Sequence, residues 1–174
     1  MDPHLAWFLL FNPLVAAGVI HLFLRRAPGT SATLSVFSSI FGLIAALGIV
    51  FASGHQTPNL EIPWLDFGAT FRAPIGLMID DLSRLMVLVV TFIGALVHIY
   101  STVYMADDAG KSRYFGNLSL FMFSMLGIVL ANNFVMMFIF WELVGVSSYL
   151  LIGHWFTRDA AAEAAKKAFL TNRI

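Results

Sequence analysis

Long apolar runs separated by short polar segments dominate the chain. Each of five runs holds close to the roughly 20 mostly apolar residues that a helix needs to cross the hydrocarbon of a bilayer. The five runs are residues 5–24, 34–52, 82–104, 114–131 and 134–156. An Ala-rich segment follows at residues 160–174 and predicts the opening of a further helix. The pattern therefore predicts an all-α polytopic membrane protein with about five transmembrane helices and the start of a sixth.

Residues 53–81, between the second and third runs, break the helical pattern. This segment contains prolines and two short extended runs, at 60–65 and 69–72, on either side of Phe67-Gly68. Extended runs bounded by turn residues are typical of a β-hairpin. We therefore predict a small hairpin loop at the membrane surface, within a single membrane domain that covers residues 1–174.

Basic residues are distributed unevenly between the two ends of the predicted spans. If five helices alternate in direction, eight basic residues fall at one end and only Arg72 and Arg84 at the other. The eight are Arg25, Arg26, Lys111, Arg113, Arg158, Lys166, Lys167 and Arg173. Cytoplasmic loops of membrane proteins carry the excess of Lys and Arg. We therefore predict a multi-pass protein of a bacterial inner membrane, with the N-terminus and the hairpin on the non-cytoplasmic side.

The composition supports the membrane assignment and excludes several function classes. Hydrophobic residues make up 59% of the chain and charged residues 11%, too few to coat a water-soluble surface. Lys plus Arg equals Asp plus Glu at 10 each, so no basic field suggests nucleic acid as a partner. The chain has no Cys, which excludes a disulfide, a thiolate metal site and an iron–sulfur cluster. We expect no cofactor and no metal site on this chain.

Glu142 is the leading candidate for chemistry. It lies about nine residues into the fifth run, which places it roughly 13 Å deep and close to the middle of a ~30 Å hydrocarbon core. A charge there costs at least ~2.5–3.5 kcal/mol, so an uncompensated carboxyl escapes by binding a proton. Such a group can take up and release protons, and we predict that Glu142 is a proton relay. The alternative is a permanently protonated Glu that is hydrogen-bonded to a neighbouring helix.

Two further candidates, His98 and Lys167, are each open to a structural explanation. His98 lies near one end of the third run, and its imidazole could pass protons or could simply be bonded to a backbone carbonyl. His21 and His154 lie near span ends, where an interfacial role explains them. Lys167 is four residues after Glu163, and this spacing suits a weak surface ion pair worth ~0.2–0.5 kcal/mol.

Several motifs together resemble the N-terminal part of a known membrane-subunit family. They are Ile79-Asp80-Asp81-Leu82-Ser83, His98-Ile99-Tyr100-Ser101, Ala131-Asn132-Asn133, Trp141-Glu142-Leu143-Val144-Gly145, Ser148-Tyr149-Leu150-Leu151-Ile152-Gly153, and Lys167-Ala168-Phe169 with Asn172-Arg173. This set resembles the antiporter-like membrane subunit, chain L or 5, of respiratory complex I, the proton-pumping NADH:quinone oxidoreductase. It is also similar to the large subunit of multisubunit sodium/proton antiporters.

The resemblance implies roles for particular residues. Glu142 matches a glutamate that moves protons together with a lysine on a later helix, and Lys167 and Arg173 match basic positions at the start of the next helix. It also implies that the chain is part of a proton-translocating NADH:quinone oxidoreductase complex. Other membrane subunits of the complex, the lipid bilayer and protons would then be its partners, with quinone reduction taking place elsewhere and no redox chemistry on this chain.

Two alternative functions stay open on the sequence. The chain could belong to a multisubunit sodium/proton antiporter, or it could be a non-catalytic membrane module. Members of the resembled family are several times longer than this chain, so we expect either an N-terminal fragment of the larger subunit or a separate small protein.

Overall fold

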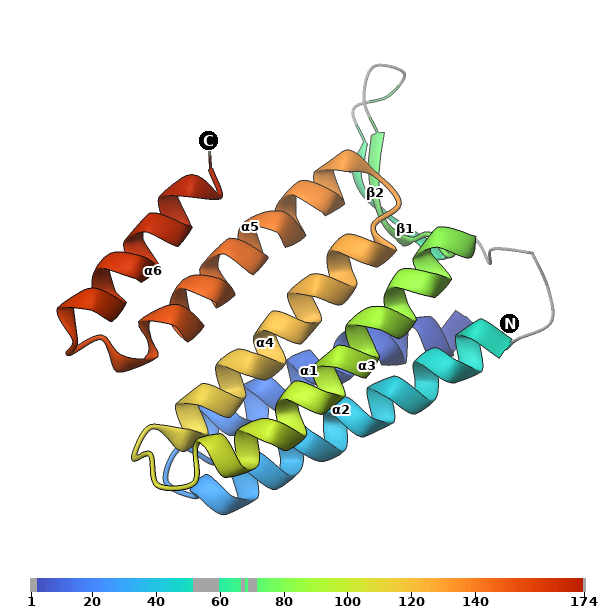
Figure 1. The fold of residues 1–174 in the computed structure, drawn as a ribbon. Coiled ribbons are helices and arrows are strands. Elements are labelled where there is room, and N and C mark those ends of the chain that lie inside the picture. The colour runs from blue at the N-terminus through green and yellow to red at the C-terminus, as the bar shows by residue number, and fades with distance from the viewer. Residues whose placement is uncertain (1–2, 52–59, 67, 69–71, 174) are drawn as a thin grey trace.

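A bundle of long helices forms the protein in the computed structural model, which describes residues 3–51, 60–66, 68 and 72–173 (Figure 1). Its helices are α1 (Pro3–Leu22), α2 (Pro28–Phe51), α3 (Asp81–Tyr104), α4 (Lys111–Leu130), α5 (Phe134–Ile152) and α6 (Asp159–Thr171), with a 3₁₀ turn η1 (Gly153–Trp155) between α5 and α6. Five of these helices, α1 to α5, are long and apolar enough to cross a membrane. The five predicted spans and the predicted helix after them are thus confirmed.

The second span is longer than its apolar run predicts. α2 begins at Pro28, six residues before the predicted start, and a proline suits the first turn of a helix because no hydrogen bond is lost there. The hydroxyls of Ser31 and Thr33 donate to carbonyls one turn back, at Ala27 and Gly29, over 2.9 and 3.0 Å. These bonds give both hydroxyls a partner in the opening turn of the helix.

The predicted hairpin is confirmed, but its second strand was misplaced. β1 (Leu60–Asp66) pairs antiparallel with β2 (Arg72–Leu77), whereas the second strand was expected at residues 69–72. Residues 69–71 of that expected strand lie outside the described residues. The register is interrupted between Ile62 and Leu65, where two residues of β1 stand opposite Pro74. Proline cannot donate to a strand ladder, and a bulge is where its missing N–H does no harm.

The turn between α4 and α5 holds the hairpin against the bundle. Asn133 caps α5 by accepting a 3.0 Å bond from the amide of Met136, and its side-chain amide donates to the carbonyl of Pro74 over 2.8 Å. Asn132 donates to Glu61 over 3.1 Å. The short Asn132-Asn133 turn thus does more than reverse the chain between two packed helices, because it also fixes the position of β1 and β2.

Small and hydroxyl-bearing residues bring α2 and α4 together. Ser35 and Ser119 lie 2.7 Å apart between their hydroxyl oxygens, and the hydroxyl oxygens of Ser31 and Ser112 lie 3.2 Å apart. All four hydroxyls are buried, and in hydrocarbon such groups need an internal partner. This line of serines was not predicted, because polar residues on an apolar helix do not reveal which neighbouring helix they face.

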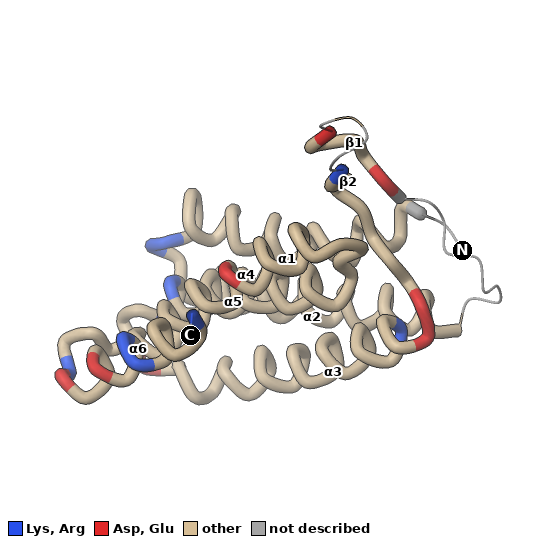
Figure 2. The backbone as a smooth tube through the Cα atoms, turned by 90° about the horizontal axis from the view of Figure 1, so that it is seen from above, with Lys and Arg blue, Asp and Glu red and all other residues tan. Residues whose placement is uncertain are grey.

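The two ends of the bundle differ in charge. Figure 2 shows that Lys and Arg gather where α1 meets α2, where α3 meets α4 and where α5 meets α6, while the middle of the helices is almost free of charge. We call this the basic end; its five loop and helix-end cations are Arg25, Arg26, Lys111, Arg113 and Arg158. The hairpin lies at the other end (Figure 1). The structure therefore places the hairpin and the basic loops at opposite ends, as the alternating spans require.

The first prediction concerns orientation in the membrane. Because the chain has no native Cys, a single engineered cysteine shows on which side of the membrane it lies, with no labelling of other residues of this chain. We expect Arg72→Cys in the hairpin to react with a membrane-impermeant maleimide added to intact cells, and Asp107→Cys at the basic end to react only after the cells are opened. Labelling of Asp107→Cys in intact cells would reverse the orientation.

A second prediction concerns the contact between α2 and α4. In a double-mutant cycle, Ser35→Ala and Ser119→Ala should couple by about 0.6 kcal/mol and by no more than about 1.7 kcal/mol in the free energy of unfolding, measured in mixed micelles. Ser35→Ala with Ser124→Ala is the control, because Ser124 bonds to the carbonyl of Leu120 in its own helix. Equal coupling in both cycles would show that the hydroxyl pair contributes nothing.

Candidate functional site

Glu142 and Arg173 form an ion pair between α5 and α6. Glu142 lies halfway along the 19-residue helix α5, and Arg173 follows the last turn of α6, which lies beside α5 and runs in the opposite direction (Figure 1). The Nη2 atom of Arg173 donates to Oε2 of Glu142, and both side chains are half-buried. The carboxyl that was expected to hold a proton for lack of a partner thus has a cation within this same stretch of chain.

Besides the ion pair, two contacts fix the end of α6 at the level of Glu142. The indole of Trp141 donates to the carbonyl of Asn172 over 3.2 Å. Gly145, one turn further along α5, leaves the space that Asn172 occupies, since a Cβ there would lie 2.7 Å from its side-chain nitrogen. The glycine therefore permits the close approach of the two helices that brings Arg173 to the carboxylate.

Aromatic rings lie next to the ion pair on the side of the basic end. The guanidinium of Arg173 stands 3.7 Å from the centroid of the Phe169 ring, a cation–π contact. Phe169 in turn packs against Tyr149 of α5, with ring centroids 5.5 Å apart. These rings orient Arg173 and lie along α5 and α6 between Glu142 and the basic end.

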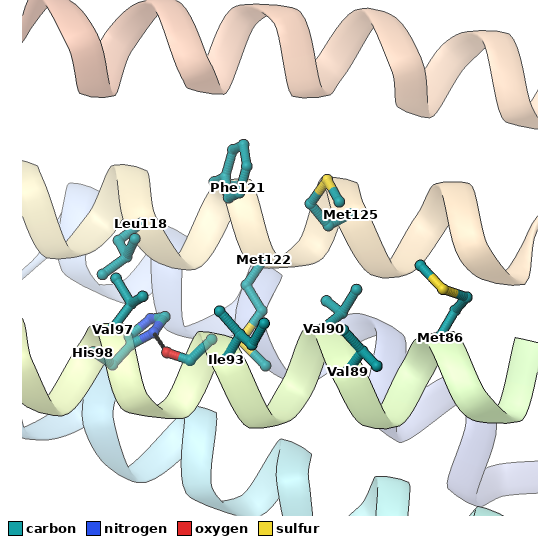
Figure 3. Close-up of a pocket in the computed structure, with 11 residues that line it drawn as sticks. Met86, Val89, Val90, Ile93, Val97, His98, Leu118, Phe121, Met122 and Met125 are labelled. Carbon is teal, nitrogen blue, oxygen red and sulfur yellow. Dashed lines mark hydrogen bonds between the residues drawn. The ribbon is translucent and has the colours of Figure 1, made fainter.

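His98 lies apart from this pair. It is buried on α3, and its Nδ1 atom is 2.7 Å from the carbonyl oxygen of Gly94 in the same helix (Figure 3). The side chains around it are apolar, as Figure 3 shows for Val97, Leu118 and Met122. α4 lies between α3 and α5, so the structure does not bring His98 to Glu142 (Figure 1). This geometry favours the carbonyl-bonded interpretation of His98, and a role in proton transfer stays a prediction.

Lys167 also lies away from the ion pair. Its side chain is exposed on α6, and among the described residues no acidic group pairs with it, so the expected contact with Glu163 is not formed. Of the four candidates Glu142, Lys167, His98 and Arg173, the structure brings together only the first and the last. No three carboxylate or imidazole side chains in the described part of the chain are grouped to hold a metal ion.

A polar cluster at the basic end was missed by the sequence analysis. Asp108, in the loop between α3 and α4, accepts a 2.7 Å bond from the indole of Trp155 and lies 3.2 Å from Nε2 of His154. Arg113 donates to the carbonyl of His154 over 2.8 Å. His154 is buried here, whereas the sequence analysis expected it at the membrane interface. These bonds join the α3–α4 loop to the junction of α5 and α6. Asp108 and His154 are 46 residues apart in the sequence, so no local sequence pattern predicts their contact.

Comparison with known proteins connects this geometry to a family. The family model described as "NADH-Ubiquinone oxidoreductase (complex I), chain 5 N-terminus" matches residues 64–115, and the one described as "NADH:quinone oxidoreductase/Mrp antiporter, TM" matches residues 131–174. The second match contains both members of the ion pair. The chain belongs to this family of complex I and Mrp antiporter membrane subunits. Its motifs were therefore correctly identified.

Curated relatives in the family are similar along almost the whole chain. The chloroplast NAD(P)H-quinone oxidoreductase subunit 5 of Adiantum capillus-veneris is 42% identical over 97% of this chain and 24% of its own length. The NADH-quinone oxidoreductase subunit L of Rickettsia typhi is 41% identical over 98% of this chain and 27% of its own length. The chain therefore spans about a quarter of the length of the curated relatives that it matches.

A solved structure shares the fold. A chain of the membrane-bound sulfane sulfur reductase, an archaeal respiratory membrane complex, superposes with a TM-score of 0.74 at 19% identity, over 95% of this chain and 33% of that one. The helical arrangement is thus one already seen in a respiratory membrane complex, which confirms the predicted fold class of a polytopic membrane protein.

The pKa of Asp108 gives a prediction for acid stability. Burial raises this pKa, but hydrogen bonds from Trp155, Gly110 and His154 lower it by more, so it lies below its ordinary value of 3.8. A carboxylate with a lowered pKa stabilises the fold above pH 3.8, and this contribution is lost as the pH falls from 3.8 through the folded pKa. We expect Asp108→Asn to lower the melting temperature at pH 7. At a pH below the folded pKa of Asp108, the variant and the wild type should melt at similar temperatures.

Thermal unfolding in detergent, followed by tryptophan fluorescence, measures this difference. Asp107→Asn, at the exposed neighbouring position, is the matched control and should melt as the wild type does at each pH. An Asp108→Asn protein whose deficit relative to the wild type is the same at pH 7 and pH 3 would contradict the assignment.

Proposed function

We propose that the chain is part of the proton-translocating membrane subunit of an NADH:quinone oxidoreductase, and that Glu142 is a proton-relay group in it. The observation that carries the proposal is the ion pair between Glu142 and Arg173 in the middle of a membrane-spanning helix. Ionisable residues at this depth are expensive and mark ion or proton paths. Membership of a family described by NADH:quinone oxidoreductase and antiporter subunits supports the same function.

The ion pair provides a physical basis for loading and releasing a proton. The guanidinium of Arg173 supplies a counter-charge to the Glu142 carboxylate within the span. When the end of α6 carries Arg173 away, the carboxylate loses its counter-charge in a low-dielectric setting and takes up a proton instead. Because a guanidinium keeps its charge, Glu142 is the member of the pair that titrates. Movement of one helix end is thereby coupled to protonation.

The energy for net transfer has to come from outside this chain. Moving one unit charge against 100 mV requires about 2.3 kcal/mol. In the proposed assembly this energy comes from electron transfer from NADH to quinone in other subunits, with no cofactor and no redox chemistry on this chain. Other membrane subunits of the complex are its proposed partners, and the basic end faces the cytoplasm.

A sodium/proton antiporter is the second candidate function. It is favoured by the match of residues 131–174, which include the ion pair, to a family model whose description names the Mrp antiporter. The two functions differ in their dependence on sodium. Proton movement that persists when choline replaces sodium supports the oxidoreductase, whereas proton exchange that requires a sodium gradient supports the antiporter. Failure to move protons under either condition would leave a non-catalytic membrane module.

A prediction for Glu142 tests the relay in the assembled complex. Glu142→Gln keeps the shape and most of the hydrogen bonding but removes the exchangeable charge, so proton uptake coupled to NADH oxidation in sealed vesicles should fall about tenfold or more. Glu142→Asp keeps the acid one methylene further from Arg173 and should retain part of the activity. Arg173→Lys, which keeps the charge, should be milder than Arg173→Gln.

Lys167→Ala is the control for this series. Lys167 is exposed and lies outside the ion pair, so its loss should reduce pumping less than the loss of either member of the pair. Assembly of each variant is checked by the amount of complex in the membrane. Full proton pumping by Glu142→Gln at normal assembly would overturn the role of Glu142.

A further inference from the structure

A cavity with two cations in a largely apolar wall opens between α4, α5 and α6, separate from the ion pair. Its volume is about 240 Å³. The residues that line it include Arg113, Asn117, Tyr149, Leu150, Phe156 and Lys166. Neither Glu142 nor Arg173 is among the lining residues, and only Tyr149 links the cavity to the ion pair, through its contact with Phe169.

The cavity is positively charged. Arg113 and Lys166 both line it, and no Asp or Glu is among the described residues of its wall. Arg113 is held in place by its 2.8 Å bond to the carbonyl of His154 and by its position 5.1 Å from the centroid of the Phe156 ring. That bond uses only one of the five N–H donors of the guanidinium. Two cations without a carboxylate in the wall make a setting that attracts an anion.

The position of the cavity selects the kind of anion. Tyr149 and Leu150 belong to the last turn of α5 and Arg113 to the first turn of α4, so the cavity lies at the end of the spans, where the headgroups of a bilayer begin. Leu150 and Phe156 give part of the wall an apolar character. A phosphate with a hydrocarbon stem satisfies both the cations and the apolar wall, whereas a free phosphate satisfies only the cations.

The same charge argues against an entrance for protons. Fixed cations in a cavity wall raise the energy of an incoming positive charge, and this is how some channels exclude protons. A proton path to Glu142 from the basic end would have to pass these cations and the packed rings of Tyr149 and Phe169. An anionic ligand is therefore the better match to the cavity.

We propose that the cavity between α4, α5 and α6 binds the phosphate headgroup of an anionic phospholipid, with Arg113 and Lys166 as its cationic ligands. Phosphatidylglycerol is a suitable probe, because its phosphate carries one negative charge that no other group in the headgroup neutralises. A lipid bound there contacts α4, α5 and α6 together.

The test counts lipids on the full-length protein within the membrane complex from which it is purified. The complex is stripped of lipid in detergent, incubated with phosphatidylglycerol or phosphatidylcholine, and weighed by native mass spectrometry. The wild type should retain phosphatidylglycerol in preference to phosphatidylcholine. Arg113→Gln with Lys166→Gln should lower the apparent affinity of one phosphatidylglycerol site by about fivefold for each cation removed, the equivalent of about 1 kcal/mol each.

Two further variants separate recognition from folding and from total charge. Lys166→Gln alone removes an exposed charge without disturbing the bond from Arg113 to His154. It should lower the apparent affinity for phosphatidylglycerol by about fivefold, the effect of one cation. Lys111→Gln with Arg158→Gln removes two charges at the same end but outside the cavity wall, and it should retain the lipid.

Three results would each overturn the proposal. They are equal retention of the lipid by the cavity variant and the charge-matched control, equal retention of the two phospholipids by the wild type, and displacement of phosphatidylglycerol by millimolar inorganic phosphate. The last of these would identify a site for a free anion.

Discussion

The absence of water in the bilayer interior constrains most of what the polar residues of this protein do. A polar group in hydrocarbon has to find its partner inside the protein. The serines of α2 meet serines of α4, His98 bonds to the carbonyl of Gly94, and Glu142 meets Arg173. The serine contacts hold α2 against α4, whereas the bond of His98 lies within α3. The third is charged, and it is the contact on which the proposed proton relay rests.

The position of α6 follows from the same constraint. By composition this helix is the least apolar of the six, and what holds its end at the middle of α5 is the set of contacts around Gly145. A side chain at Gly145 would push Asn172 away and withdraw Arg173 from Glu142. At its other end, the 3₁₀ turn carries His154 and Trp155 into contact with Asp108. The chain is therefore held on both sides of α6, beside Glu142 and at the loop of the basic end.

How much was predictable depends on whether a feature is local in the sequence. Hydropathy found all five spans because length and apolarity are properties of one segment, and the depth of Glu142 followed from counting residues along α5. The second strand was misplaced because Pro74 looks like a strand breaker until it is seen opposite a bulge in β1. Arg173 as the partner of Glu142, and Ser119 as the partner of Ser35, required the register between two helices. Neither an apolar run nor a charge count contains that register.

Charge is used in opposite ways at the two places where it matters. In the middle of α5 one carboxylate and one guanidinium compensate each other, so the pair is neutral overall. At the basic end the cations Arg113 and Lys166 share a cavity wall that has no acid among its described residues, so compensation has to come from a ligand. Tyr149 connects the two regions, because its side chain lines the cavity and its ring packs on Phe169, which carries Arg173. An anion that settles in the cavity therefore acts on the same helix pair that holds the relay.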